Sequence, residues 1–160
     1  MPYSMENSAY ADAAGQLLSI IYLQKIREDA SAAYSAGAAG YAQMVGSKSF
    51  VNIIGVCPMK PEKKDLALKI MREEAAKLAT TVNAEDLAKT QKNMIKDFET
   101  QAKQNNFWIN TLSLWYKNGI DNYTGYADVV KGMTPAKVSA FVKKVLSQGN
   151  DLEIIMLPKE

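Results

Sequence analysis

The chain has 160 residues, of which 48% are apolar and 22% are charged, and these fractions exclude an intrinsically disordered chain. Its 19 basic and 17 acidic side chains leave a net charge of +2, without the basic clustering of a nucleic-acid-binding protein. It contains no histidine, so it cannot itself build a catalytic zinc site of the common histidine-bearing types. Any hydrolytic role would therefore need a metal held by another domain.

The first predicted element is a long helix with one buried face, because apolar side chains recur at three-and-four spacing over residues 6–29. Ser4, Asn7 and Ser8 are each suited to cap its N-terminus. Arg27 falls in the last predicted turn, where the exposed carbonyl groups favour a cation.

A change to a period of two predicts a strand over residues 31–43, with Tyr34 near its start. Its side chains are mostly glycine and alanine, which are poor strand formers, so we expect another backbone to approach the sheet closely there. Residues 45–48 predict a turn. Residues 50–57 are apolar on both faces except at Asn52, which predicts an interior strand of the same sheet.

Two helices are predicted next. Pro61 and Glu62 begin the first, which ends near Thr80. Asn83 caps the second, whose apolar positions continue to Phe98. Because these helices are neighbours in sequence, we expect them to form an antiparallel pair.

An aromatic-rich helix is predicted to follow and to stop at Gly119. Its Trp108, Trp115 and Tyr116 suggest a binding surface, since aromatic residues dominate interfaces. At helical spacing such residues are more often core, and that is the interpretation we favour. The residues alone do not decide whether Asn105-Asn106 contacts a ligand or only separates two helices.

The remaining pattern predicts a short helix over 123–130, a helix from Thr134-Pro135 to Gly149, and an apolar strand over 152–157. Together these elements predict a single α+β domain over residues 1–160, with helices on one face of its sheet. Three strands make a thin sheet for so many helices. We therefore expect one or two further strands to precede Met1 in a longer polypeptide.

The lone Cys57 can form neither an internal disulfide nor a metal cluster, and without a histidine partner it is better interpreted as a small buried hydrophobe than as a nucleophile. No apolar run is long enough to span a membrane, and the N-terminus lacks the regions of a signal peptide.

A series of motifs runs in order along nearly the whole chain: the helix ending in Arg27, the Y-S-A-G strand, C-P-M-K-P-E-K, N-A-E-D-L, Q-N-N-F-W-I, M-T-P-A-K-V and I-I-M-L-P. Together these motifs resemble the pitrilysin or insulin-degrading-enzyme family of zinc metallopeptidases, and more narrowly its C-terminal, zinc-free domain.

The resemblance implies a processing-peptidase-like metallohydrolase fold with an antiparallel-rich sheet, here a fragment of a two- or four-domain peptidase. In that family a catalytic half carries the inverted zinc motif H-x-x-E-H, which this chain lacks, and the two halves close around an extended peptide. The resemblance further implies that Arg27 and Tyr34 reach the substrate beside a zinc held by the partner half. Family members often carry glycine where this chain has Ser31. The family suggests a bacterial cytoplasmic or periplasmic location, and the residues leave the compartment undetermined.

A guanidinium and a phenol can both donate to a peptide carbonyl or to the oxyanion that it becomes, so the implied role is chemically sensible. Arg27 could instead only complement the helix end, and Tyr34 could be ordinary strand packing. The main prediction is a non-catalytic, substrate-embracing domain that holds no metal and hydrolyses nothing alone.

Two alternatives stand beside it. One is an architectural or substrate-presenting subunit of the same fold. The other is an interaction module, because missing strands would expose a sheet edge that recruits another strand or a second copy of the chain.

Overall fold

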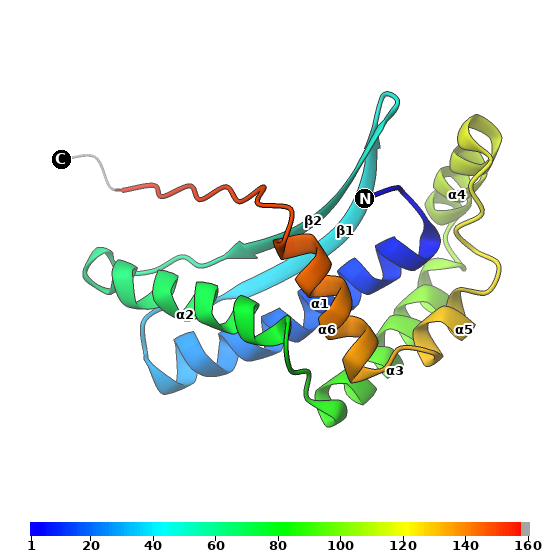
Figure 1. The fold of residues 1–160 in the computed structure, drawn as a ribbon. Coiled ribbons are helices and arrows are strands. Elements are labelled where there is room, and N and C mark those ends of the chain that lie inside the picture. Colours follow the sequence, from blue (N-terminus) through cyan, green and yellow to red (C-terminus); the bar gives the residue numbers. More distant parts are fainter. Residues whose placement is uncertain (158–160) are drawn as a thin grey trace.

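The computed structural model describes residues 1–157, and within them helices pack around a two-stranded antiparallel sheet (Figure 1). This confirms the predicted α+β class. In chain order the elements are α1 (Met5–Tyr22), the π-helix η1 (Leu23–Asp29), β1 (Gly37–Val45), β2 (Lys48–Val56), the 3₁₀ turn η2 (Pro61–Lys63), α2 (Lys64–Leu78), α3 (Ala84–Gln101), α4 (Asn105–Asn118), α5 (Tyr126–Lys131) and α6 (Pro135–Leu146).

Helix α1 is the centre of the fold. The Ser4 side chain accepts a hydrogen bond from the Asn7 N–H at 3.0 Å, so Ser4 is the cap among the three candidates. One apolar stripe of α1 is buried against the sheet, and other turns of the helix contact α2, α3, α5 and α6. The core therefore lies between α1 and the elements that surround it.

The sheet is a single hairpin in which Gly37 lies opposite Val56 and Val45 opposite Lys48. Its two-residue turn places Gly46 at φ 61°, a backbone conformation that costs glycine little. Among residues 1–157, β2 pairs only with β1, so the predicted interior position of this strand is wrong within the described chain. The strand before the turn begins at Gly37, six residues later than predicted.

The predicted close approach of a second backbone is confirmed, and the partner is α1. A Cβ atom at Gly40 would fall on the carbonyl oxygen of Ala11, and one at Gly15 would fall on the backbone of Ala39 and Gly40. Beside them the Ser19 hydroxyl both accepts from the Ala38 N–H and donates to the Ala38 carbonyl, each at 2.7 Å. Glycine at both crossing positions thus lets helix and strand touch through their backbones.

Helices cover one face of the sheet, as predicted, and leave the other open (Figure 1). On the open face Tyr41, Phe50 and Ile54 are each about two-fifths exposed, and Val45 is 60% exposed. The fold thus presents an apolar sheet face to its surroundings.

Helices α2 and α3 do not form the predicted antiparallel pair, because each packs mainly on a different stretch of α1. Figure 1 shows them diverging from the connection that joins them. Local start signals were nevertheless accurate. The Asn83 side chain accepts from the N–H groups of Glu85 and Asp86, and the Thr134 side chain accepts from the Lys137 N–H.

The predicted strand over 152–157 is wrong. This segment is extended but has no ladder partner among residues 1–157, and its apolar side chains are exposed, Leu152 at 85% and Met156 at 91%. Within residues 1–157 its main tie is the ion pair between Glu153 and Arg72. An apolar run favours an extended backbone, but only a neighbouring strand edge makes it a strand.

Helix α4 also departs from prediction. Gly119 ends it in a left-handed conformation, as predicted, but Trp115 is 59% and Tyr116 88% exposed rather than core. Trp108 is half-buried, and its Nε1 donates to the Ala102 carbonyl at 2.8 Å. No helix within residues 1–157 has the length and hydropathy to cross a membrane.

Candidate functional site

Arg27 lies at the end of η1, which continues directly from α1. In this π-helix the Ala30 N–H reaches back five residues to the Lys25 carbonyl at 3.2 Å, so each turn holds more residues than an α-helical turn. Ile26 points inward and is fully buried, whereas Arg27 is exposed. The buried Ile26 thereby fixes the turn that carries Arg27.

The chain leaves η1 through Ser31, which has φ 47°, in the left-handed region that a non-glycine residue rarely adopts. The next residue, Ala32, is fully buried and its N–H donates to the Ile26 carbonyl at 2.8 Å. This turn needs the conformation that glycine adopts most easily. That gives a physical reason for glycine at this position in the family that the sequence resembles.

Tyr34 follows this turn and lies before β1 rather than in it. Its neighbour Ala33 forms an isolated antiparallel bridge with Met59, which anchors the backbone. The Tyr34 side chain itself is 87% exposed, so strand packing does not explain it.

The structure brings the two predicted site residues together. The Arg27 guanidinium carbon lies 5.6 Å from the centroid of the Tyr34 ring, within the range of a cation–π contact. The carboxylate of Asp29, two residues on, is already engaged: it accepts from Gln24 at 2.9 Å and from Lys25 at 3.0 Å. These hydrogen bonds, the one from Gln24 first, lower the pKa of Asp29.

Within residues 1–157 Arg27 forms no ion pair. Arg27 is exposed and the Tyr34 side chain is 87% exposed, so both donor groups belong to one solvent-accessible surface segment, joined by the ring contact. Such a pair can donate several hydrogen bonds to a carbonyl-rich ligand that crosses this surface.

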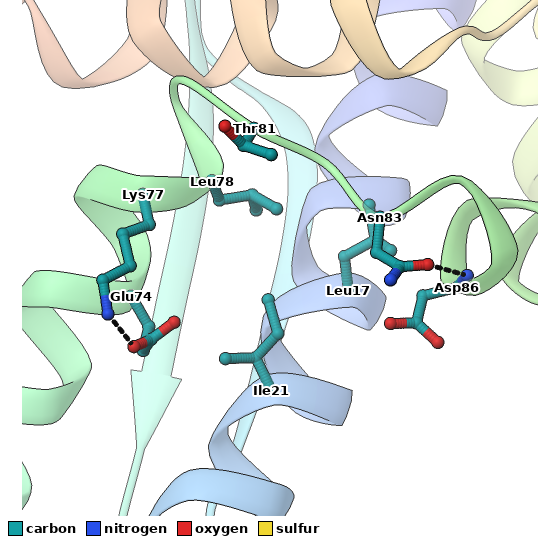
Figure 2. Close-up of a pocket in the computed structure, with 8 residues that line it drawn as sticks. All are labelled: Leu17, Ile21, Glu74, Lys77, Leu78, Thr81, Asn83 and Asp86. Atoms are coloured by element: carbon teal, nitrogen blue, oxygen red, sulfur yellow. Dashed lines mark hydrogen bonds and ion pairs between the residues drawn. The ribbon is translucent and has the colours of Figure 1, made fainter.

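The pair lies outside a cavity of about 240 Å³ formed where α1, α2 and the start of α3 meet (Figure 2). Leu17, Ile21 and Leu78 give it an apolar wall. Several of its polar groups are already engaged, since Glu74 pairs with Lys77 at 2.6 Å and Asn83 caps α3. We interpret this cavity as a packing gap between helices and not as a binding site.

Within residues 1–157 no group of three or more candidate ligands could hold a metal ion. Cys57 is half-buried, and burial raises the pKa of its thiol, which keeps it in the unreactive protonated form at neutral pH. Asn105 and Asn106 form the exposed first turn of α4.

Sequence reasoning missed a second cavity, lined by Asp12, Asp97 and Tyr126 among others. One signal was available: Asp12 interrupts the most alanine-rich stretch of α1, where both neighbours are buried. The sequence could not show that α3, α4 and α5 bring further polar groups to the same place.

No family model and no curated protein matches this sequence. Solved structures do match. The periplasmic protease PqqL from Escherichia coli superposes with a TM-score of 0.70 at 24% identity, over 92% of this chain and 16% of that one. The ferredoxin protease FusC, as a point mutant in complex with Arabidopsis ferredoxin, superposes with a TM-score of 0.68 at 14% identity, over 89% of this chain and 16% of that one.

The chain therefore spans about a sixth of each protease that it resembles. At these identities the likeness concerns the fold, which resembles a pitrilysin-like domain, as the sequence motifs predict.

Proposed function

We propose that this chain is a non-catalytic, substrate-embracing domain of a zinc metallopeptidase, in which Arg27 and Tyr34 support the scissile peptide opposite a zinc-bearing half. The observation that carries the proposal is their contact: two exposed donor side chains, seven positions apart, meet at 5.6 Å on one surface. The likeness to parts of two proteases supports the peptidase context.

The geometry suits a peptide backbone as ligand. The guanidinium presents several N–H donors in a fixed plane, and the phenol adds an O–H. As a carbonyl becomes an oxyanion during hydrolysis, hydrogen bonds to it strengthen, so donors placed there lower the barrier. A pair that binds backbone carbonyls would accept many sequences, and the metal and the general base would belong to the partner half.

A second candidate is an architectural or substrate-presenting subunit of the same fold. It is compatible with the exposed apolar surfaces on the sheet and on α4, since patches of this kind mark contacts with other polypeptides. These surfaces serve both candidates, whereas the Arg27–Tyr34 pair matters only to the first.

The test is peptide hydrolysis by the peptidase assembled with its H-x-x-E-H half, comparing Arg27→Ala and Tyr34→Phe with the wild-type chain. Removing one transition-state donor typically costs about a hundredfold in kcat, and we expect a loss of roughly ten- to a hundredfold for these outward-facing donors.

The chain offers matched controls. Arg72→Ala removes an exposed arginine elsewhere, and Tyr116→Phe removes a hydroxyl from a residue that is 88% exposed, against 87% for Tyr34. We expect both controls to retain wild-type turnover. Equal turnover in all four variants would remove the peptide-supporting role and favour the architectural subunit.

A further inference from the structure

Two extended stretches of the chain have backbone groups that no neighbouring strand uses. β1 occupies one edge of β2, and the other edge of β2 has no ladder partner among residues 1–157. Residues 152–157 are also extended and have no ladder partner in the described part of the chain. Unpaired N–H and C=O groups along an extended backbone are a template for pairing with another strand. Each stretch therefore offers a strand edge to a partner.

Helix α2 connects these two stretches in space. An added Cβ at Gly55 in β2 would fall 2.7 Å from the Cε of Met71. The next residue of the helix, Arg72, donates from its Nε to Glu153 at 3.1 Å. In Figure 1, β1 lies on one side of β2 and residues 152–157 on the other, and β2 runs in the same direction as residues 152–157. The free edge of β2 is thus on the side where this segment runs.

The free edge of β2 lacks the features that usually protect a sheet edge. Monomeric proteins protect such edges with charged side chains, prolines or bulges. β2 carries one charge, Lys48 at its first position, has no proline, and pairs with β1 through all nine residues without a bulge. Its β-branched residues, which favour strands, are Val51, Ile53, Ile54 and Val56. This edge is therefore suited to accept a further strand.

Residues 152–157 are suited to be that strand. Ile154 is 75% and Met156 91% exposed, whereas Ile155 between them is 44% exposed. This alternation is typical of a strand with one covered face, and the covered side also carries Glu153 on α2. Six extended residues span roughly 20 Å, which matches most of β2. Because the segment is already extended, pairing requires little further ordering of its backbone.

We propose that two copies of this chain form a dimer in which residues 152–157 of each copy add as an antiparallel strand to the free edge of β2 in the other. Within one copy, β2 and residues 152–157 run in the same direction, so a copy related by a two-fold axis perpendicular to the sheet brings in its segment antiparallel to both. The two donated segments then lie next to each other at the axis. This arrangement makes one continuous antiparallel sheet and closes both β2 edges. The inference does not depend on the proposed peptidase role.

The first test measures the mass of the 160-residue chain by size-exclusion chromatography with light scattering, from about 10 to about 300 μM. We expect the mass to rise with concentration from 17.6 kDa toward twice that value and no further. Hydrogen exchange at the amides of residues 152–157 should slow at the higher concentration, because ladder hydrogen bonds protect them. A mass that stays at that of one chain, or that grows past two chains, overturns the proposal.

The second test uses variants of the donated segment. Ile154→Pro removes a ladder N–H at a side chain that is 75% exposed, so it should fold as wild type and dimerise at least about tenfold more weakly. Met156→Pro should do the same. Ile154→Thr is the matched control, because it removes apolar surface but keeps the N–H and a β-branched side chain, and its dimer affinity should stay within about threefold of wild type.

Three results with these variants would overturn the proposal. The first is a dimer that persists in both proline variants. The second is a dimer that is lost in Trp115→Ala, which would place the interface on α4. The third is an equal loss in Ile154→Thr and Ile154→Pro, because apolar contact and not strand pairing would then hold the two copies together.

Discussion

Replacing Gly40 by alanine perturbs the closest contact between α1 and the sheet. The added Cβ would fall on the Ala11 carbonyl oxygen, which is backbone and cannot rotate away. The helix and strand must therefore separate by at least about 1 Å, and a gap of 0.5–1 Å already loses a quarter to a half of each van der Waals contact across it. The paired hydrogen bonds between Ser19 and Ala38 cross the same interface and would lengthen with it.

Overpacking of a tight contact costs about 1–3 kcal/mol, and we expect Gly40→Ala to lie at or above the top of that range because neither partner is a flexible side chain. For a chain of this size, about 3 kcal/mol corresponds to a fall of roughly 6–12 °C in Tm. Urea unfolding followed by circular dichroism, with thermal unfolding alongside, measures this loss.

The same strand supplies the control. At Gly37 an added Cβ would meet only the Ser19 hydroxyl at an ordinary 3.6 Å, and the backbone there is not left-handed. Gly37→Ala should leave stability unchanged or raise it by about 0.4–1 kcal/mol, because alanine restricts the unfolded chain. If the two variants unfold at the same urea concentration, the backbone contact between α1 and β1 is not what requires glycine.

Three further predictions concern stability. Ser31→Gly should raise the free energy of unfolding by about 1 kcal/mol, because it relieves a left-handed backbone at φ 47°; an unchanged urea midpoint would contradict this. Burial raises the pKa of Tyr22 to about 12, so its protonated phenol contributes stability that is complete below about pH 10 and is lost as the pH rises to about 12. Unfolding measured at alkaline pH should show this loss of stability. In Tyr22→Phe the loss between about pH 10 and 12 should be smaller. Trp108→Ala should cost about 3 kcal/mol, whereas Trp115→Ala, at a side chain 59% exposed, should cost less than about 1; equal urea midpoints would refute the difference in burial.

Signals that act within a few residues were predictable from the sequence. Asn83 and Thr134 cap their helices because their side chains reach N–H groups two or three positions away. A cap of this kind depends only on neighbouring residues, so the sequence predicts it. The small residues of the first hairpin strand also predicted a close backbone approach, although only the fold showed that α1 is the partner.

Features that depend on a distant partner were not predictable. Trp115 has the spacing of a core residue, but burial requires another element over that face of α4, and none covers it within residues 1–157. The segment over 152–157 has strand propensity without a strand beside it. The π-helical turn under Arg27 was likewise hidden, because a hydrogen bond reaching back five residues leaves no distinct pattern of apolar positions.

The same distinction between local and distant signals applies to the candidate site. The resemblance pointed to Arg27 and Tyr34, and the chain geometry explains how residues seven apart can meet: the turn at Ser31 reverses the backbone so that the Tyr34 ring returns to the guanidinium. The cavity at Asp12 required helices that are distant in sequence, so its assembly was visible only in three dimensions.

The open sheet face, the outer face of α4 and the exposed apolar segment over 152–157 lie on separate elements, and all favour contact with other polypeptide. A peptidase half and an architectural subunit both need such contacts, so their loss would weaken assembly under either hypothesis. The Arg27–Tyr34 contact differs, because two exposed polar side chains contribute little to the stability of the fold. Arg27→Ala therefore distinguishes the peptidase half from the architectural subunit only if the variant still assembles with the partner half. In that case a lower turnover supports the peptidase half. Arg72→Ala, which removes an equally charged side chain with its own exposed ion pair, sets the level of change that loss of a surface charge produces by itself.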